Sequence, residues 1–401
     1  MMPPDSEEIA LSKAAPRLDS VDLLRGFVMV LMVLDHVRDF FGNVQVNATD
    51  PGTSTIPLFF TRWITHFCAP TFVFLAGTGA YLAGSRGMSK AALSRFLLTR
   101  GIWLALLELT LVRLGMTFDL TFRFFPLTVL WAIGISMVVL SVLVFLPTTL
   151  IAWLGVTMIV VHNAFDGVAP QDFGRFADVW RLLHIQGMLD FQIAGRPVFG
   201  LYPLIPWMGV MAAGYAFGAI VRNPNAEFRR AGLWNLGLAM IALFVFLRWL
   251  NVYGDPRPWT AQERGPVYTV LSFLNCQKYP PSLLYLLMTL GPAITLLAIF
   301  DWRGAGMLTK PLTTFGRVPL FYYLLQWPLI HLLAVGVNAG LGQPYKWLLG
   351  NGPFEAPANY GYSLPVVYLM WMATLLLIYA PCAWFAGLKK RHRDGWWLSY
   401  L

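Results

Sequence analysis

The sequence predicts an all-α, polytopic membrane protein with about ten transmembrane helices, and three observations support this fold class. First, 57% of the 401 residues are hydrophobic and only 12% are charged, whereas a soluble globular domain carries roughly 25% charged residues. Second, apolar runs long enough to span a bilayer, about 20 residues, recur along the chain. Third, basic residues gather in short loops between alternate runs, as the positive-inside rule describes.

The apolar runs divide the chain into three predicted regions. Residues 1–20 form an N-terminal tail, residues 21–388 a single transmembrane domain, and residues 389–401 a basic C-terminal tail. The tail lacks the small-residue cleavage site of a signal peptide, so we expect the first helix to be retained. Pro147 is the only break between the fourth and fifth runs. The predicted spans cover roughly residues 21–41, 57–83, 96–116, 124–146, 148–165, 199–221, 231–251, 282–300, 316–339 and 363–387.

The basic residues predict the orientation in the membrane. They precede the first span, lie between the second and third and between the eighth and ninth, follow the sixth, and close the chain. We therefore expect both termini to be cytoplasmic and the protein to lie in the cytoplasmic (inner) membrane. This distribution also explains the net charge of +9 without nucleic acid as a partner. The opposite loops are longer and are expected to be functional; they cover about 166–198, 252–281 and 340–362.

The first span contains side chains that a membrane helix normally excludes. A charge at the centre of a bilayer helix costs at least about 2.5–3.5 kcal/mol, and such residues usually face the interior of a bundle or a water-filled cavity. This free-energy cost indicates that the charged side chains of the first span have a specific role. They are Asp22, Arg25, Asp35 and His36, followed directly by Arg38 and Asp39.

Helical geometry places most of these groups on one face of the first span. Arg25 and His36 are separated by about 1100° of rotation, roughly 20° past three full turns, and by about 16 Å of rise. Asp22 lies one turn before Arg25 and can form an ion pair with it. An alternative interpretation is an Asp–Arg pair that fixes helix packing and a histidine at the interface. The predicted face carries Asp22, Arg25, Met29, Met32 and His36.

These residues carry a resemblance to a known family. The spacing Asp22-x-x-Arg25, with His36 after ten further residues, is similar to the N-terminal signature of membrane acyltransferase-3 families. RLDSVDLLRGFVMVLMVLDHVRDFF, together with APTFVFLAGTGAYL in the second span, more specifically resembles bacterial members of the heparan-alpha-glucosaminide N-acetyltransferase-like family. RGIWLALLE, KYPPSLLYLLMTLGP and FGRVPLFYYLLQWPLIHLL, in the third, eighth and ninth spans, extend the resemblance over most of the chain.

The resemblance implies a helical fold around a central channel. Acyl-CoA, with acetyl-CoA as the donor co-substrate, would enter from the cytoplasm. A glycan, lipid-linked sugar or small acceptor would approach from the other side. His36 matches the catalytic histidine of the family, and Arg25 matches the conserved arginine of the same helix. The chain lacks the lumenal N-terminal region of the lysosomal members, so the resemblance does not establish heparan as the acceptor. It also has Gln326 where bacterial relatives often carry histidine.

Acyl transfer needs a base for the acceptor proton, and histidine suits this role because its ordinary pKa lies close to neutral pH. His36 is therefore the predicted base. Asp39, at i+3, or Asp35, beside it, could orient the imidazole; Asp35 lies about 100° around the helix and is the poorer geometric candidate. A covalent acyl-histidine intermediate is the alternative route, and the sequence does not separate the two.

The donor and acceptor are predicted to bind at opposite ends of the first span. Arg25, paired with Asp22, and Arg95 and Arg100 are predicted to bind the phosphates of acyl-CoA, because guanidinium groups bind phosphate bidentately. The positive-inside bias alone would also place arginines there. On the outer side, interfacial anchoring is the alternative interpretation of His66, and a turn that opens a proline-started helix is the alternative for Lys278 and Tyr279. The predicted acceptor-binding residues there are His66, Arg62, Lys278, Tyr279 and His331.

The outer loop after the fifth span is rich in potential metal ligands, but their spacing matches no standard ligand pattern. We therefore predict no metal site. The three cysteines are far apart and predict neither a disulfide nor a metal centre. The loop residues concerned are His162, Asp166, Asp172, Asp178, His184 and Asp190.

The sequence therefore predicts a membrane acyltransferase, most simply an acetyltransferase, that modifies a hydroxyl or amino group at the outer face. A secondary transporter that uses the polar face of the first helix as a relay is the main alternative, although neither inverted repeats nor matching interrupted helices are evident. A pathway subunit without catalytic activity is a third possibility, against which the intact Asp22, Arg25 and His36 set argues. The sequence leaves the oligomeric state open, and a homo-oligomer is one alternative.

Overall fold

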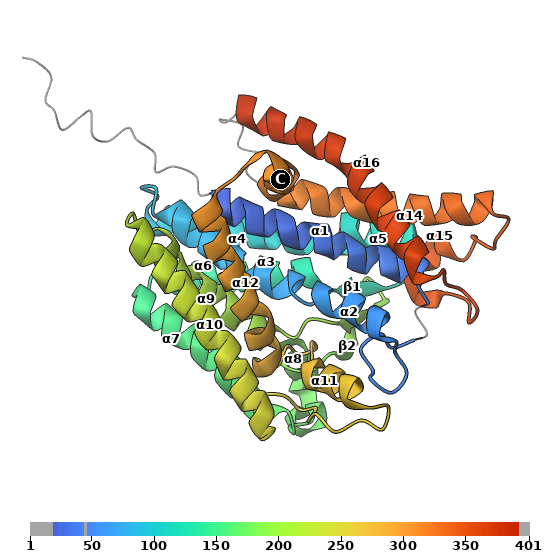
Figure 1. Ribbon diagram of the computed structural model, residues 1–401, viewed down its shortest axis with the longest axis horizontal. Coiled ribbons are helices and arrows are strands. Elements are labelled where there is room, and N and C mark those ends of the chain that lie inside the picture. Colours follow the sequence, from blue (N-terminus) through green and yellow to red (C-terminus); the bar gives the residue numbers. More distant parts are fainter. Residues whose placement is uncertain (1–18, 44–45, 393–401) are drawn as a thin grey trace, which may run out of the picture.

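Ten long helical segments correspond to the ten predicted spans in the computed structural model, which describes residues 19–43 and 46–392 (Figure 1). The second span is two helices in succession, and the third contains a π-helical segment, η2. The segments are α1 (Asp19–Phe41), α2 (Ile56–Thr65) with α3 (Cys68–Gly84), α4 (Lys90–Leu107) with η2 (Glu108–Val112) and α5 (Arg113–Thr117), α6 (Val129–Leu143), α7 (Thr148–Val161), α9 (Leu204–Val221), α10 (Ala226–Leu250), α12 (Leu283–Arg303), α14 (Pro319–Gly340) and α16 (Leu364–Arg391).

The all-α, polytopic membrane class is confirmed. Within the described residues, seven helical segments are long and apolar enough to cross a membrane: α2 with α3, α7 with the short helix that follows it, α9, α10, α12, α14 and α16. Among the other three, α6 is apolar but has only 15 residues, and α1 carries the charges described above. The count of ten spans therefore stays a prediction.

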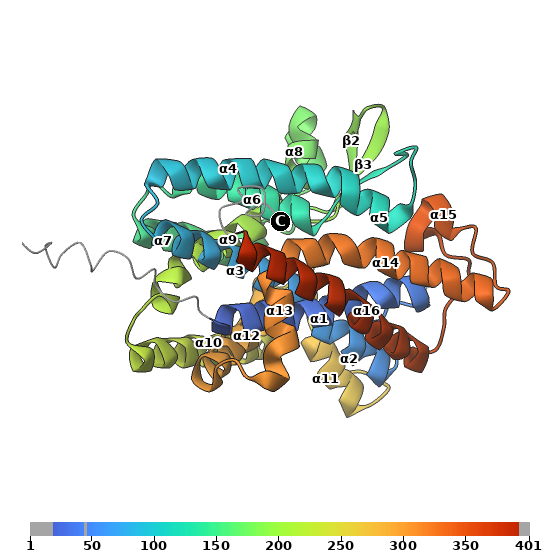
Figure 2. The same ribbon diagram turned by 90° about the horizontal axis from the view of Figure 1, so that it is seen from above.

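The described chain begins and ends at the same end of the bundle (Figures 1 and 2). This arrangement agrees with an even number of spans. Of the predicted N-terminal tail, residues 1–18 lie outside the described residues, as do residues 393–401 of the predicted C-terminal tail. The basic residues Lys389, Lys390 and Arg391 form the last turn of α16. The division into a transmembrane domain and two tails remains a prediction.

Helix α1 lies inside the bundle and packs against α2, α3, α12, α14, α16 and α13 (Lys310–Arg317), which runs across it (Figure 2). Two glycines allow this crossing. A Cβ atom at Gly26 would lie 1.8 Å from the carbonyl oxygen of Leu312, and one at Gly316 would lie 1.9 Å from that of Asp22. The backbones therefore approach closely enough to fix the position of Asp22 and Arg25 in the bundle.

A small sheet and several short helices connect the long ones, and the sequence did not predict the sheet. Its strand order is β1-β3-β2, with β1 parallel and β2 antiparallel to β3. These elements are β1 (Phe125–Leu127), β2 (Gly187–Ile193), β3 (Arg196–Gly200), η3 (His162–Phe165), η4 (Pro170–Phe176), α8 (Ala177–Leu183), α11 (Pro266–Leu274), η5 (Met307–Thr309), α15 (Leu348–Asn351) and η6 (Gly352–Glu355).

The fourth helical segment starts later than predicted because its first residues form β1. The structure begins α6 at Val129, where the Glu108 carboxylate accepts hydrogen bonds of 2.8 Å from the Leu130 backbone N–H and from the Thr128 hydroxyl. A carboxylate at this position satisfies N–H groups that a helix N-terminus leaves without a partner. Buried Glu108 thus joins the third helical segment to the fourth.

A buried ion pair closes the loop after α5. The Arg113 guanidinium donates to the Asp119 carboxylate at 2.5 Å, to the Asp119 carbonyl at 2.7 Å and to the Phe124 carbonyl at 2.6 Å. Burial opposes ionisation of Asp119, but hydrogen bonds from the Thr121 hydroxyl, backbone N–H groups and Arg113 outweigh it and hold the pKa of this carboxyl well below its ordinary value of 3.8. The loop is therefore anchored by a charged carboxylate.

Replacing Asp119 with alanine is expected to lower the free energy of unfolding by about 3–5 kcal/mol, because it leaves the Arg113 charge buried without its partner. Since the folded-state pKa of Asp119 is depressed, its stabilisation is present above about pH 4 and is lost as the pH falls below that value. Unfolding of the detergent-solubilised protein between pH 3 and 7 measures both effects. Glu263→Ala, at an exposed carboxylate, is the control; equal losses in both variants would contradict the assignment.

Candidate active site

A cavity of about 300 Å³ lies among α1, α3, α4, α6 and α14. Its lining is mostly apolar and extends along α3 from Phe72 to Ala83, a rise of about 16 Å. Arg25 of α1 and Arg100 of α4 are the charged residues in the lining. The cavity therefore combines mostly apolar walls with two positively charged arginine side chains.

One face of α1 connects this cavity to His36. Arg25, Met29 and Met32 all line the cavity, as expected for residues on the predicted face. Asp22 forms the expected ion pair with Arg25, at 3.2 Å. Tyr323 of α14 also lines the cavity, and its ring centroid lies 6.3 Å from that of His36 in an edge-on contact. The cavity lining thus includes a side chain in contact with His36.

His36 is half-buried and held by aromatic contacts. Its ring stacks on Trp327, with the centroids 3.9 Å apart and the planes 25° from parallel. Its Nδ1 atom is enclosed and has no hydrogen-bond partner among the described residues, which leaves Nε2 as the nitrogen that a reactant can reach. Gln326 lies beside the ring, and its amide atoms are likewise buried without a partner among the described residues. The ring is therefore fixed by packing.

The two carboxylates predicted to orient His36 bind arginines. Arg38 donates to Asp35 at 3.1 Å and to Asp39 at 2.6 Å, and Arg62 forms a further ion pair with Asp35. Among the described residues, no hydrogen bond joins either carboxylate to His36. The four charged groups form a neutral network next to the imidazole, and the orienting role remains a prediction.

Four of the five predicted acceptor-binding residues gather near this end of α1. Arg62 pairs with Asp35, and Lys278 lies within electrostatic range of Asp35, His36 and Asp39. His66 is buried, and Lys278 and Arg62 lie within electrostatic range of its ring. Tyr279 lies near Arg62. The segment before α12 and the end of α2 thus bring polar groups to His36.

The structure places His331, the fifth, in a different environment. Its Nδ1 and Nε2 atoms lie 3.2 Å from the Gly115 carbonyl and 3.0 Å from the Leu348 carbonyl. Its ring stacks on Phe118 at 3.8 Å and contacts Phe40 at 4.9 Å. These contacts join α14 to α5 and α15. The structure does not bring His331 into the His36 group.

Arg95 also lies apart from the other predicted donor-binding residues. It is exposed on α4 and is not part of the cavity lining, whereas Arg100, five residues later, is part of it. Residues five apart on a helix lie about 140° apart around its axis, so only one of the two can face the cavity. A phosphate-binding role for Arg95 remains a prediction.

Sequence reasoning missed several residues of the site, chiefly Tyr323 and Trp327, which contact His36. Tyr323, Trp327 and His331 recur every four residues and so occupy one face of a helix, and this spacing could have indicated that α14 faces α1. A second cavity, of about 660 Å³, is lined by Thr128, Asp119 and residues of β1 and β3. No periodic sequence pattern predicts it, because loop residues and two short strands that are distant in the sequence, β1 and β3, form its lining.

The fold and the site define a multi-pass α-helical membrane protein with a cavity that is lined by two arginines and by a tyrosine in contact with the packed His36. Residues 17–253 match the sequence model of the catalytic domain of heparan-alpha-glucosaminide N-acetyltransferase. The chain therefore belongs to this family, and the match supports a membrane acetyltransferase-type function. The match includes α1 and the cavity-lining helices α3, α4 and α6. No curated protein matches the chain.

Proposed function

We propose that the protein transfers an acetyl group from cytoplasmic acetyl-CoA to a hydroxyl or amino group of a glycan or related acceptor at the outer face of the inner membrane. One observation carries this proposal: the same face of α1 provides Arg25, Met29 and Met32 to the cavity and continues to His36. Under the proposed topology, with both termini in the cytoplasm, this face leads from the donor side to the acceptor side.

The cavity suits the donor. Arg25 and Arg100 provide guanidinium groups for the phosphates of acetyl-CoA, and the apolar walls suit the flexible arm that carries the thioester. A volume of about 300 Å³ accommodates such an arm rather than the whole molecule, so the nucleotide would remain at the cytoplasmic mouth. Tyr323, at the contact with His36, lies where the thioester would meet the base.

The chemistry at His36 is assigned to Nε2, because Nδ1 is enclosed. In direct transfer, Nε2 takes the proton as the acceptor oxygen or nitrogen attacks the thioester carbonyl. The carbon–sulfur bond then breaks, and the CoA thiolate leaves and is protonated to the thiol. In the covalent route, Nε2 itself attacks the thioester carbonyl and the CoA thiolate leaves as the carbon–sulfur bond breaks. The acceptor then attacks the acetyl-imidazole, the carbon–nitrogen bond breaks, and the proton of the acceptor passes to the thiolate. Both routes use the same nitrogen and yield the same products.

The acceptor would bind at the other side of His36. Lys278, Arg62 and Tyr279 offer hydrogen-bond donors near the imidazole, as expected for a site that binds sugar hydroxyls or an anionic glycan. The family name denotes an α-glucosaminide as acceptor of N-acetylation. An amino sugar is therefore the first acceptor to test.

A secondary transporter is the alternative function. It would be expected to contain interrupted helices at matching positions of two halves. The break between α2 and α3 and the π-helical segment η2 both lie in the N-terminal half of the described chain. The family match also favours transfer over transport.

Incubation of the purified protein with labelled acetyl-CoA and a panel of amino sugars and glycans, beginning with glucosamine, tests the proposed function. We expect label in the acceptor and release of free CoA in equal amounts. Binding of neither acetyl-CoA nor free CoA, together with flux of a small solute in proteoliposomes, would instead favour the transporter.

Replacing Arg100 with glutamine is expected to raise KM for acetyl-CoA about 10- to 100-fold, because a charge-assisted hydrogen bond contributes about 1.5–3 kcal/mol. Steady-state kinetics with varied donor measure the effect. Lys90→Gln, at an exposed cation on the same helix but outside the cavity lining, is the matched control and should change KM less than about twofold. A larger effect at Lys90 than at Arg100 would contradict the assigned donor position.

A further inference from the structure

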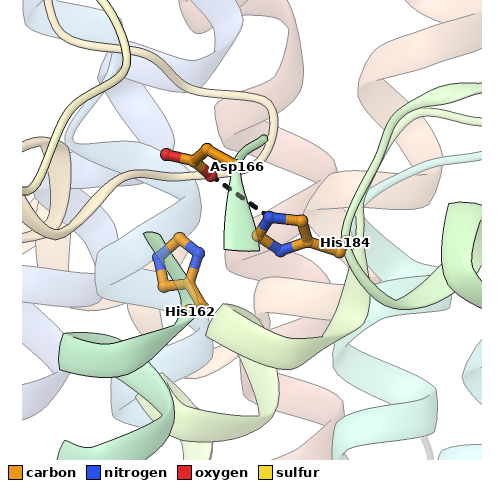
Figure 3. A group of neighbouring side chains, drawn as sticks. All are labelled: His162, Asp166 and His184. Atoms are coloured by element: carbon orange, nitrogen blue, oxygen red, sulfur yellow. Dashed lines mark ion pairs between the residues drawn. The ribbon is translucent and has the colours of Figure 1, made fainter. Parts of the chain in front are cut away.

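Three potential metal ligands from the outer loop meet at one point, although the sequence separates them (Figure 3). His162 begins η3 directly after α7, Asp166 follows the end of η3, and His184 follows the end of α8. One ligand atom from each lies within 4.8 Å of those from the other two. The closest pair is His184 Nε2 and Asp166 Oδ1, at 3.2 Å.

The two histidines are buried without the hydrogen bonds that buried polar groups normally make. Only 2% of His162 and 1% of His184 is exposed. None of their four ring nitrogens makes a hydrogen bond of good geometry among the described residues. The polar neighbours of the two rings are Asp166, 3.2 Å from His184 Nε2, and the Pro281 carbonyl near His162. These contacts restore only part of the hydration that the rings lose on burial, and coordination of a metal ion by one nitrogen of each ring would compensate for the remainder.

Neighbouring residues orient the Asp166 carboxylate so that one of its oxygens can bind such an ion. Asn163 donates from Nδ2 to Asp166 Oδ2 at 2.8 Å, which leaves Oδ1 directed toward His184. Asn163 also accepts a hydrogen bond of 2.9 Å from the Leu283 backbone N–H at the start of α12. Hydrogen bonds of this kind orient the ligands of metal sites. Trp180 packs on His184, with ring centroids 4.9 Å apart.

We propose that His162, Asp166 and His184 bind one divalent transition-metal ion, with zinc as the expected ion. Two imidazoles and one carboxylate form a ligand set found in zinc sites, where a water molecule occupies the fourth position. Tetrahedral ligands of zinc lie about 3.4 Å apart, so small side-chain rotations would complete the set. The Asp166 side chain, 19% exposed, provides the route for the ion and for the water.

The sequence predicted no metal site because the spacing of these ligands matches no standard pattern. His162 and Asp166 stand at the two ends of the short helix η3, so this single element sets their separation. His184 joins them only through the folding of η4 and α8. The ion would therefore fasten α8 to the end of α7 and, through Asn163, to the start of α12. Lys278 and Tyr279, near His36, lie a few residues before that start, so the site would stabilise the acceptor side.

Metal analysis of the full-length protein, purified without a histidine tag and dialysed against metal-free buffer after addition of zinc, tests the proposal. We expect one zinc ion per chain. Removal of the ion by a chelator should lower Tm by several degrees, and added zinc should restore it. Replacement of zinc by cobalt should produce visible absorption bands of a histidine- and carboxylate-bound ion.

Asp166→Asn keeps the size of the side chain and its ability to accept from Asn163, but removes the charged ligand. It should lose the bound zinc and the effect of the chelator on Tm, as should His184→Ala. Asp172→Asn, at an exposed acidic residue of the same loop, should retain both. If the wild type binds no more zinc than Asp166→Asn, or if chelation changes Tm equally in both, the metal site does not exist.

Discussion

Replacing His36 with alanine is expected to reduce kcat for acetyl transfer by about 10²–10⁴-fold, the contribution that a positioned general base typically makes. The expectation rests on the position of the ring. It stacks on Trp327 at 3.9 Å, contacts the cavity-lining Tyr323, and leaves Nε2 accessible. Binding of acetyl-CoA should persist, because Arg25 and Arg100 remain in place. Turnover of labelled acetyl-CoA with glucosamine as acceptor measures the loss.

His36→Gln provides a second variant that preserves a polar side chain of similar size but lacks a base. It should be as inactive as His36→Ala while showing a thermal unfolding curve close to that of the wild type. His392→Ala, at an exposed histidine at the end of α16, should retain full activity. If His36→Gln kept wild-type kcat, the catalytic assignment would be wrong, irrespective of the effect on stability.

Replacing Gly79 with phenylalanine is expected to reduce kcat/KM for acetyl-CoA about 100-fold. Gly79 lines the cavity, and a Cβ atom there would meet no other atom within 4 Å, so the new ring would fill the cavity instead of distorting the helix. A donor arm that buries about 100 Å² of apolar surface gains about 2.5 kcal/mol. Loss of that contact corresponds to about 70-fold in kcat/KM, on the order of the 100-fold expected. Steady-state kinetics with varied acetyl-CoA measure the effect.

Two control variants separate occlusion of the cavity from general damage. Gly79→Ala adds one methyl group to the same position and should have little effect. Gly336→Phe introduces the same ring into α14 at an exposed glycine with equally open surroundings, outside the cavity lining. Unchanged donor kinetics in Gly79→Phe would show that acetyl-CoA does not use this cavity.

The sequence predicted much of the fold because hydrophobic length and helical period are local properties. The ten predicted spans all correspond to helical segments, and the close division at Pro147 separates α6 from α7 as expected. The shared face of Arg25, Met29 and Met32 also follows from their spacing within one helix. These features need no information about the neighbours of α1.

The parts that the sequence did not predict depend on packing between distant segments. Tyr323 and Trp327 become part of the site only because α14 packs against α1. The sheet escaped prediction because β1 has three residues, Phe125–Leu127, within an apolar run that reads as the start of a helix. Likewise, His184 meets His162 through intervening short helices, and no local pattern indicates this meeting.

An assay with acetyl-CoA and the acceptor on opposite sides of a vesicle membrane tests the central claim most directly. Inverted membrane vesicles, with the cytoplasmic face outward, are loaded with a membrane-impermeant oligosaccharide that ends in glucosamine, and labelled acetyl-CoA is added outside. The proposed function predicts labelled oligosaccharide in the lumen, and none in vesicles that contain His36→Ala. It also predicts no product when the oligosaccharide is present only outside. Product formed only when both substrates lie on the outside would contradict transfer across the membrane along the face of α1.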